Sequence, residues 1–122
     1  MKKIDVAKSE VQSLVAEYRA SAVAQSVATE SGDHRKANRH HDVIADIYRE
    51  LRRRGRDAQA ALLPLLDDID PRVRAWAAAH ALEFAPDRGQ PVLNRLRSAG
   101  GVVGLNAEMT LEEWSRGSLR FP

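Results

Sequence analysis

Apolar residues recur three or four positions apart along most of the chain, and this spacing places them on one face of an α-helix. Residues 6–30 show the spacing and predict a long first helix, with Asp5 as its N-cap and Gly32 just past its end. Residues 33–54 predict a second helix, for which Asp33 is the candidate cap. The first half of the chain is therefore predicted to be two helices.

The central stretch predicts two shorter helices. Residues 58–66 are an apolar run that contains Pro64, and a proline inside a helix kinks it because its ring nitrogen donates no hydrogen bond. Asp70 followed by Pro71 is typical of a helix start, since aspartate caps a helix and proline is tolerated at the first helical position. The helix that begins at Pro71 is predicted to end before Pro86.

The C-terminal third is less regular. A helix is predicted at about residues 88–98, and the glycines that follow it are predicted to interrupt the next one: Gly100, Gly101 and Gly104. Thr110 and Glu113 have the spacing of a capping box, in which each side chain bonds to the other residue's backbone N–H. We therefore expect a short final helix over residues 111–116.

The segment LLPLLDDIDPRVRAWAAAHAL closely resembles a HEAT repeat, in which a short aspartate-containing turn joins two antiparallel helices. The residues that carry the likeness are the proline of the first helix and the opening and small residues of the second: Pro64, Asp70, Pro71, Val73, Arg74, Ala78 and Leu82. The resemblance implies that Arg74 pairs with an aspartate of the turn. A weak period of 30 residues, which aligns Val43 with Val73 and Leu62 with Val92, favours stacked hairpins.

These patterns predict an all-α fold, a HEAT/ARM-like α-α superhelix of stacked antiparallel hairpins with about five to six helices. A chain of 122 residues has the length of one ordinary domain. We expect this domain to contain hairpins at about residues 5–55 and 57–85, a helix at about 88–98, and a capping tail at 99–122.

The chain also resembles a small bacterial family known as domain of unknown function 2019, which is described as HEAT-like. The central hairpin and the ending AEMTLEEWSRGSLRFP carry this likeness. In that family a glycine-containing loop precedes a Met, Ser or Thr, Leu segment, and Met109, Thr110 and Leu111 match it here. The likeness covers about the last two thirds of the chain. It implies the fold and no particular activity.

Composition excludes several classes of protein. The chain has no cysteine, so it has no disulfide framework, thiolate metal site or cysteine nucleophile. Its N-terminus carries Lys2 and Lys3 but lacks the apolar core of a signal peptide. No stretch approaches the roughly 18 consecutive apolar residues of a membrane span. We expect a bacterial cytoplasmic protein that does not bind membranes.

The histidines near residue 40 are the only cluster that suggests a metal. His34 and His41 are seven residues apart, about 10 Å along a helix, which is too far to chelate one ion. His40 and His41 are adjacent and point about 100° apart, and Asp42 follows them. We therefore predict no metal site.

The second predicted helix is rich in cations. Between residues 34 and 56 the net charge is +5, against −3 for the rest of the chain, and the cations are Arg35, Lys36, Arg39, Arg49, Arg52, Arg53, Arg54 and Arg56. Such a cluster can bind nucleic acid phosphates. However, Asp46 and Glu50 have the spacing to pair with Arg49, Arg53 and Arg54.

No residue set has the pattern of a catalytic site. Trp76 and His80 lie four residues apart and can line a pocket, but on an alanine-rich helix they are more typical of a core. The serines lack a nucleophile-elbow motif, and no glycine-rich loop has phosphate-binding spacing. We predict that the protein is not an enzyme and takes no cofactor.

The remaining hypothesis is a non-catalytic protein-binding module, a small HEAT-like adaptor or inhibitor that binds another protein through the groove of its stacked hairpins. The residues predicted to contact this partner are Arg35, Arg39, Arg52, Arg53, Arg56, Arg72 and Trp114. One alternative is a nucleic-acid-associated protein that uses the arginine-rich helix. Another is an immunity-type protein that neutralises a toxin, which rests on analogy with other small helical proteins.

Overall fold

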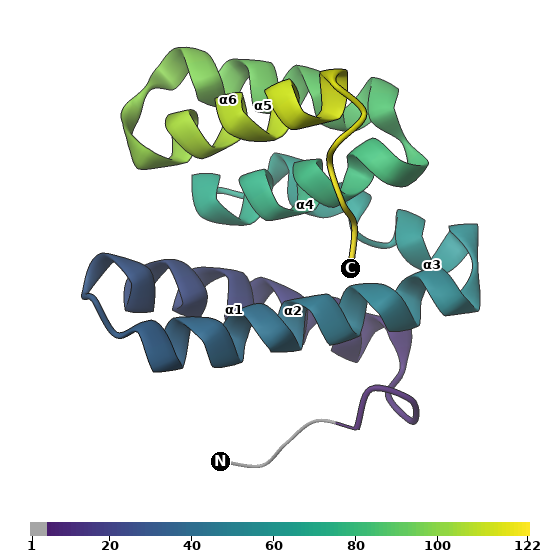
Figure 1. Ribbon diagram of the computed structural model, residues 1–122. Coiled ribbons are helices and arrows are strands. Elements are labelled where there is room, and N and C mark those ends of the chain that lie inside the picture. Colours follow the sequence, from purple (N-terminus) through teal and green to yellow (C-terminus); the bar gives the residue numbers. More distant parts are fainter. Residues whose placement is uncertain (1–4) are drawn as a thin grey trace. The chain divides into compact units, whose positions relative to one another are not determined.

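The computed structural model describes residues 5–122, and Lys2 and Lys3 lie outside the described residues. The described residues contain six α-helices and one 3₁₀ helix, and none of them forms a strand (Figure 1). The predicted all-α class of packed helical hairpins is thus confirmed. The chain divides into two compact units, one that ends at Ala61 and also takes in Pro122, and one formed by Leu62–Phe121. The predicted single domain stays a prediction.

The first unit is a helical hairpin followed by one short helix. Its helices are α1 (Val11–Glu30), α2 (His34–Arg54) and α3 (Arg56–Ala60), and α1 and α2 run antiparallel (Figure 1). The turn between them uses Gly32, whose φ of +79° suits a residue without a Cβ. Asp33 then caps α2, because its Oδ1 accepts a hydrogen bond from the Lys36 amide at 3.1 Å. This cap was predicted correctly.

The start of the first helix was predicted wrongly. The helix begins at Val11 and not at residue 6, and its N-cap is Glu10, whose side chain makes no capping hydrogen bond. Asp5 does not cap the helix. Its carbonyl instead accepts hydrogen bonds from the Ser9 hydroxyl at 2.7 Å and the Lys8 amide at 3.2 Å, which close a separate turn.

The core of the first unit lies between α1 and α2 and is made of aliphatic and tyrosine side chains. Its fully buried members are Leu14, Tyr18, Ala22, Ile44, Ile47, Tyr48 and Leu51. Gln59 from α3 reaches this core, where its Nε2 donates to the Tyr48 hydroxyl at 3.1 Å. Burial, and after it the neighbouring Tyr48, raise the pKa of Tyr18 well above its ordinary value, so the Tyr18 phenol is neutral at pH 7.

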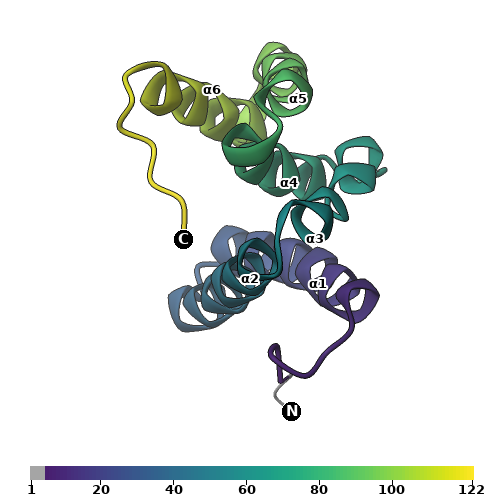
Figure 2. The same ribbon diagram turned by 90° about the vertical axis from the view of Figure 1, so that its right-hand side faces the viewer.

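The second unit contains a 3₁₀ helix, η1 (Leu63–Asp67), and the helices α4 (Pro71–Phe84), α5 (Pro86–Ala99) and α6 (Gly101–Ser115). Within this unit α5 packs against both α4 and α6 (Figure 2). The predicted kinked helix over residues 58–66 is wrong: it consists of α3, a turn, and then η1. Pro64 lies in the first turn of η1, where its missing N–H leaves no hydrogen bond unmade.

The turn before α4 follows the predicted pattern. The Asp70 carboxylate accepts from the Arg72 amide at 2.9 Å, and Pro71 occupies the first turn of the helix. Asp68 in turn accepts from the Asp70 amide at 2.9 Å. The Arg74 guanidinium donates to the Asp68 carbonyl at 2.9 Å. Arg74 therefore binds a backbone oxygen of the turn and not an aspartate carboxylate.

The C-terminal prediction was wrong in length. Gly100 and Gly101 have φ of +79° and +73° and form the turn after α5, as expected, but Gly104 lies inside α6. Instead of a short helix over residues 111–116, α6 runs from Gly101 to Ser115. Thr110 is therefore an interior residue, and its hydroxyl donates to the Asn106 carbonyl at 2.9 Å instead of capping a helix start.

Helices of the second unit approach closely at small residues. A Cβ on Gly89 of α5 would stand 2.6 Å from the Ala78 carbonyl oxygen of α4, and one on Gly104 of α6 would stand 2.8 Å from the Leu96 carbonyl oxygen of α5. Larger buried side chains fill the space around these contacts: Leu65, Leu66, Val73, Leu82, Val92, Leu93, Leu96 and Leu111. The glycines thus set the spacing of all three helices.

Replacing Gly89 tests this packing directly. Helix propensity alone predicts that Gly89→Ala stabilises α5 by about 1 kcal/mol. The close Ala78 carbonyl predicts the opposite, a net loss of about 1–2 kcal/mol in the free energy of unfolding, because overpacking outweighs propensity. Urea unfolding measures the difference in the free energy of unfolding between variant and wild type. Asn106→Ala on the exposed side of α6 is the control, and its stability should change only as helix propensity predicts. A stabilised Gly89→Ala protein would contradict the packing account.

Candidate interaction surfaces

The arginine-rich end of α2 is organised around one buried carboxylate. The Glu50 carboxylate accepts hydrogen bonds from Arg53 at 3.0 and 2.5 Å and from Arg54 at 2.6 Å. These hydrogen bonds lower the pKa of Glu50 from 4.5 to about 2. The bond from Arg53 has the largest effect and the bond from Arg54 the next largest, while burial acts in the opposite direction. The predicted pairing along this helix is therefore confirmed.

The same cations also hold other parts of the first unit. Arg54 donates to the carbonyls of Val6 at 2.9 Å and Ala7 at 3.3 Å, which ties the segment before α1 to the end of α2. The Arg52 guanidinium lies 5.6 Å from the centre of the Tyr48 ring and also donates to a Pro122 oxygen. Arg52 and Arg53, which were predicted to contact a partner, thus have structural contacts within this unit.

The remaining cations of α2 fall into one that forms an ion pair and three that do not. Arg49 pairs with Asp46 at 2.9 Å. Arg35, Lys36 and Arg39 are exposed in the first two turns of α2, and their side chains form no ion pair with any residue that the structure describes. Cations at a helix start oppose the positive end of the helix dipole, so helix stability does not account for them.

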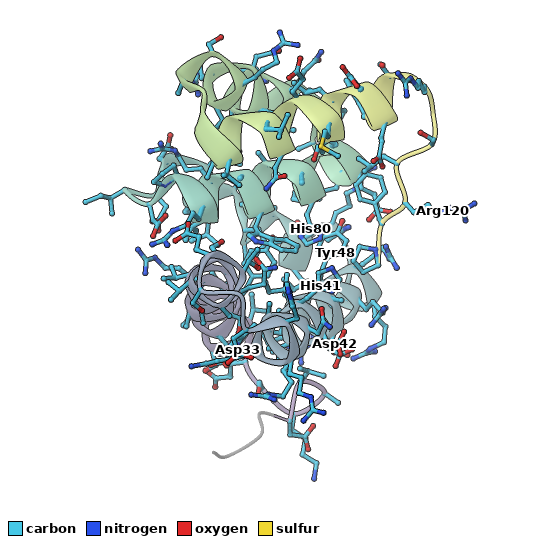
Figure 3. All side chains as sticks on the ribbon, turned by 60° about the vertical axis from the view of Figure 1, so that its left-hand side comes forward. Asp33, His41, Asp42, Tyr48, His80 and Arg120 are labelled. Atoms are coloured by element: carbon cyan, nitrogen blue, oxygen red, sulfur yellow. The ribbon has the colours of Figure 1, made fainter. Side chains whose placement is uncertain are left out.

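The histidine cluster forms no metal centre among residues 5–122, where no three His, Asp or Glu side chains gather closely enough to hold an ion. Figure 3 marks His41 and Asp42 on α2. The His41 Nδ1 lies 3.9 Å from the Asp42 carboxylate, and both side chains are more than half exposed. An exposed pair of this kind contributes little stability.

The candidate residues on α4 are engaged in the structure of the second unit. His80 is buried, and its ring centre lies 6.0 Å from that of the half-buried Trp76. Arg72 forms an ion pair with Asp70, its own cap residue, at 3.0 Å. These contacts between Arg72 and Asp70 hold the start of α4.

The outer face of α6 carries an exposed apolar row that was not predicted from the sequence. Val102, Leu105 and Met109 are 68%, 56% and 50% exposed, and they lie three and four residues apart, so they share one face of the helix. The buried residues of α6 lie on its opposite face: Gly104, Ala107 and Leu111. We call the exposed set the α6 stripe. It was missed because α6 was predicted to begin only at residue 111.

Carboxylates border the α6 stripe. Glu112 and Glu113 follow Met109 by three and four residues, and Glu108 follows Leu105 by three, so each neighbours the stripe on the helix surface. All three are exposed. Glu112 lies 4.0 Å from the exposed Arg116, whereas the Glu108 and Glu113 side chains form no ion pair with the residues described here. The outer face of α6 is thus apolar and acidic.

The seven predicted contact residues are divided between the two units. Arg35, Arg39, Arg52, Arg53 and Arg56 belong to the first unit, whereas Arg72 and Trp114 belong to the second. Trp114 is half-buried on α6, on the side away from Leu105. The exposed apolar residues of α6 follow the helical period of 3.6 residues. The α6 stripe could therefore have been predicted if the glycines had not been expected to interrupt the helix over residues 101–115.

No α-helix that the structure describes is both long enough and apolar enough to cross a membrane.

Comparison with known proteins places the fold. The chain matches the family described as domain of unknown function (DUF2019) over residues 12–114. The crystal structure of the protein RPA1889 from Rhodopseudomonas palustris CGA009 is similar, with a TM-score of 0.89 and 29% sequence identity, over 98% of this chain and 100% of that chain. No curated protein matches the chain. The family resemblance seen in the sequence is thus confirmed, and it extends into the first hairpin.

The buried carboxylate makes the first unit sensitive to acid. Because the folded pKa of Glu50 is depressed to about 2, its stabilisation is fully present above pH 4.5 and is lost as the pH falls towards 2. After allowance for the exposed Arg53, Glu50→Gln is expected to cost about 1–2 kcal/mol at pH 7.

Urea unfolding of wild type and Glu50→Gln at pH 7, 4 and 3 measures this effect. The difference between the two proteins should shrink as the pH falls, while Glu108→Gln on the exposed face of α6 should follow the wild type at every pH. A Glu50→Gln protein as stable as wild type at pH 7 would show that the buried ion pairs contribute nothing.

Proposed function

The chain belongs to the family DUF2019, and we propose that it is a non-catalytic protein-binding module whose binding surface is the α6 stripe. The observation that carries the proposal is the row of three exposed apolar side chains on a helix that already buries its other face. Scattered exposed apolar residues are normal on proteins. Three in one helical row form a patch, and exposed apolar patches are typical of protein interaction sites.

The free energy available from covering the α6 stripe supports the same proposal. Each side chain of the α6 stripe keeps half or more of its surface in water, although neither folding nor solubility requires an apolar residue there. Covering apolar surface stabilises a complex by about 25 cal/mol per Å². Leu105 lies between Val102 and Met109 on the helix and is therefore expected to contribute most, because central residues of an interface are best shielded from water.

We also propose that the hairpins are HEAT-like units, as the segment from Pro64 to Leu82 resembles that repeat. The Arg74 contact with the Asp68 carbonyl agrees with this proposal.

A second candidate, nucleic-acid binding, rests on the three cations at the start of α2. Arg35, Lys36 and Arg39 are exposed, and helix stability does not explain them. Such cations contact phosphates, and binding then weakens steeply with salt. The arginines at the other end of α2 support this candidate less, because Arg53 and Arg54 already pair with Glu50.

Capture from bacterial lysate tests the protein-binding proposal. The tagged wild-type chain should retain a specific protein at high salt, and Leu105→Asp should reduce that retention at least tenfold, because a charge at the centre of the stripe prevents apolar contact. Val27→Asp is the matched control, since Val27 is an equally exposed apolar residue on α1. Equal capture by wild type and Leu105→Asp would contradict the assignment of the surface.

Salt titration tests the second candidate. If the chain binds nucleic acid through α2, the plot of log affinity against log salt should become shallower by up to about 2.7 when Arg35, Lys36 and Arg39 are all changed to Gln. The protein-binding proposal predicts instead that this triple variant captures its protein partner as the wild type does. Fluorescence anisotropy with a labelled DNA or RNA duplex measures the slope.

A further inference from the structure

We propose that the partner presents a basic amphipathic helix, which lies along α6 with its apolar residues on the α6 stripe and its Lys or Arg residues against Glu108, Glu112 and Glu113. This inference rests on the proposed function and adds the chemistry of the partner. It follows from the charges around the stripe and not from the stripe alone.

The geometry of α6 puts the carboxylates beside the apolar row. At 100° per residue, Glu112 and Glu113 lie on opposite sides of Met109, and Glu108 lies beyond Leu105 on the same side as Glu112. A helix that lies on the stripe therefore meets carboxylates along both of its edges. Lysine and arginine suit these edges best, because their long side chains cover apolar surface while their charged ends stay in water.

The folded chain does not account for these carboxylates. Glu112 and Glu113 lie in the last turns of α6, where negative charge opposes the negative end of the helix dipole. The only ion pair found for them within the described residues is the exposed 4.0 Å contact between Glu112 and Arg116, which is of a kind that contributes little. Glu108 has none. Like the apolar stripe, the carboxylates are explained by a complementary partner.

A second copy of the chain fits this surface less well. The outer face of α6 carries three carboxylates and one cation, Arg116. Two such faces brought together would hold six carboxylates and two arginines, and like charges across an interface disfavour association. A nucleic acid is disfavoured for the same reason, since its phosphates would meet the carboxylates. The charge of the surface thus selects a basic partner.

The size of the stripe indicates the character of the contact. Three partly exposed side chains fall well short of the roughly 800 Å² that each partner buries in a standard stable interface. We therefore infer a weak and rapidly formed complex, in which the carboxylates steer association and choose the partner. Its affinity should fall as salt is added, because salt screens the charges. The part of the affinity that comes from apolar contact should remain.

The test uses two synthetic helical peptides of about 18 residues. Both carry leucines at positions i, i+3 and i+7, and the positions beside this row are Lys in one peptide and Glu in the other. Fluorescence anisotropy measures their binding to the full chain at low and at physiological salt. We expect the Lys peptide to bind at least tenfold more tightly than the Glu peptide, and Leu105→Asp to weaken its binding at least tenfold.

A charge-reversed protein supplies the decisive comparison. The triple variant Glu108→Lys, Glu112→Lys and Glu113→Lys should prefer the Glu peptide. The control triple variant Asp42→Lys, Asp57→Lys and Asp87→Lys has the same net charge but changes exposed carboxylates on α2, α3 and α5, and it should keep the preference of the wild type. Circular dichroism checks that every variant is folded.

The outcomes separate this inference from the proposed function. Equal binding of both peptides, or of neither, overturns the basic partner, while capture from lysate that still depends on Leu105 leaves the protein-binding function standing. If Leu105→Asp changes neither peptide binding nor capture, both proposals are wrong. A wild-type dimer in sedimentation that Leu105→Asp dissociates would show that the occupant is a second copy.

Discussion

The backbone contact at Gly104 decides which way α6 faces. A Cβ at this position would stand 2.8 Å from the Leu96 carbonyl, so only glycine allows α6 to lie this close to α5. Once Gly104 faces inward, Ala107 and Leu111 face inward with it because they follow at helical spacing. The opposite side of the helix, which carries Leu105, must then face water. The exposed α6 stripe is a consequence of that single contact.

The two units use their charges differently. In the first, Glu50 is buried beneath Arg53 and Arg54, and the pairs stabilise the end of α2 and hold the segment before α1. In the second, the carboxylates of α6 are exposed, and Glu112 and Glu113 oppose the helix dipole. Charges that stabilise the fold therefore lie mostly on α2, whereas charges that the fold does not use lie on α6 and at the start of α2. Only the second kind informs a proposal about partners.

Sequence patterns predicted the helices that have clear start signals. Asp33 and the Asp70-Pro71 pair mark the starts of α2 and α4, because a cap hydrogen bond is a local property of a few residues. The end of the chain was not predicted, because a glycine that breaks a helix and a glycine that lets two helices touch look the same in one sequence. Gly104 is of the second kind, so α6 and its exposed face were missed. Pairing within α2 was predicted because residues three and four apart always neighbour each other on a helix.

The central claim is that the α6 stripe contacts a protein partner. Methyl NMR of the chain, free and bound to the protein captured from lysate, tests it most directly, since Val102, Leu105 and Met109 each carry a methyl group. The account predicts that these signals shift or broaden on binding while those of Val27 and Ile69, which are also exposed, do not. Shifts confined to Val27 or Ile69, with the three α6 signals unchanged, would contradict it.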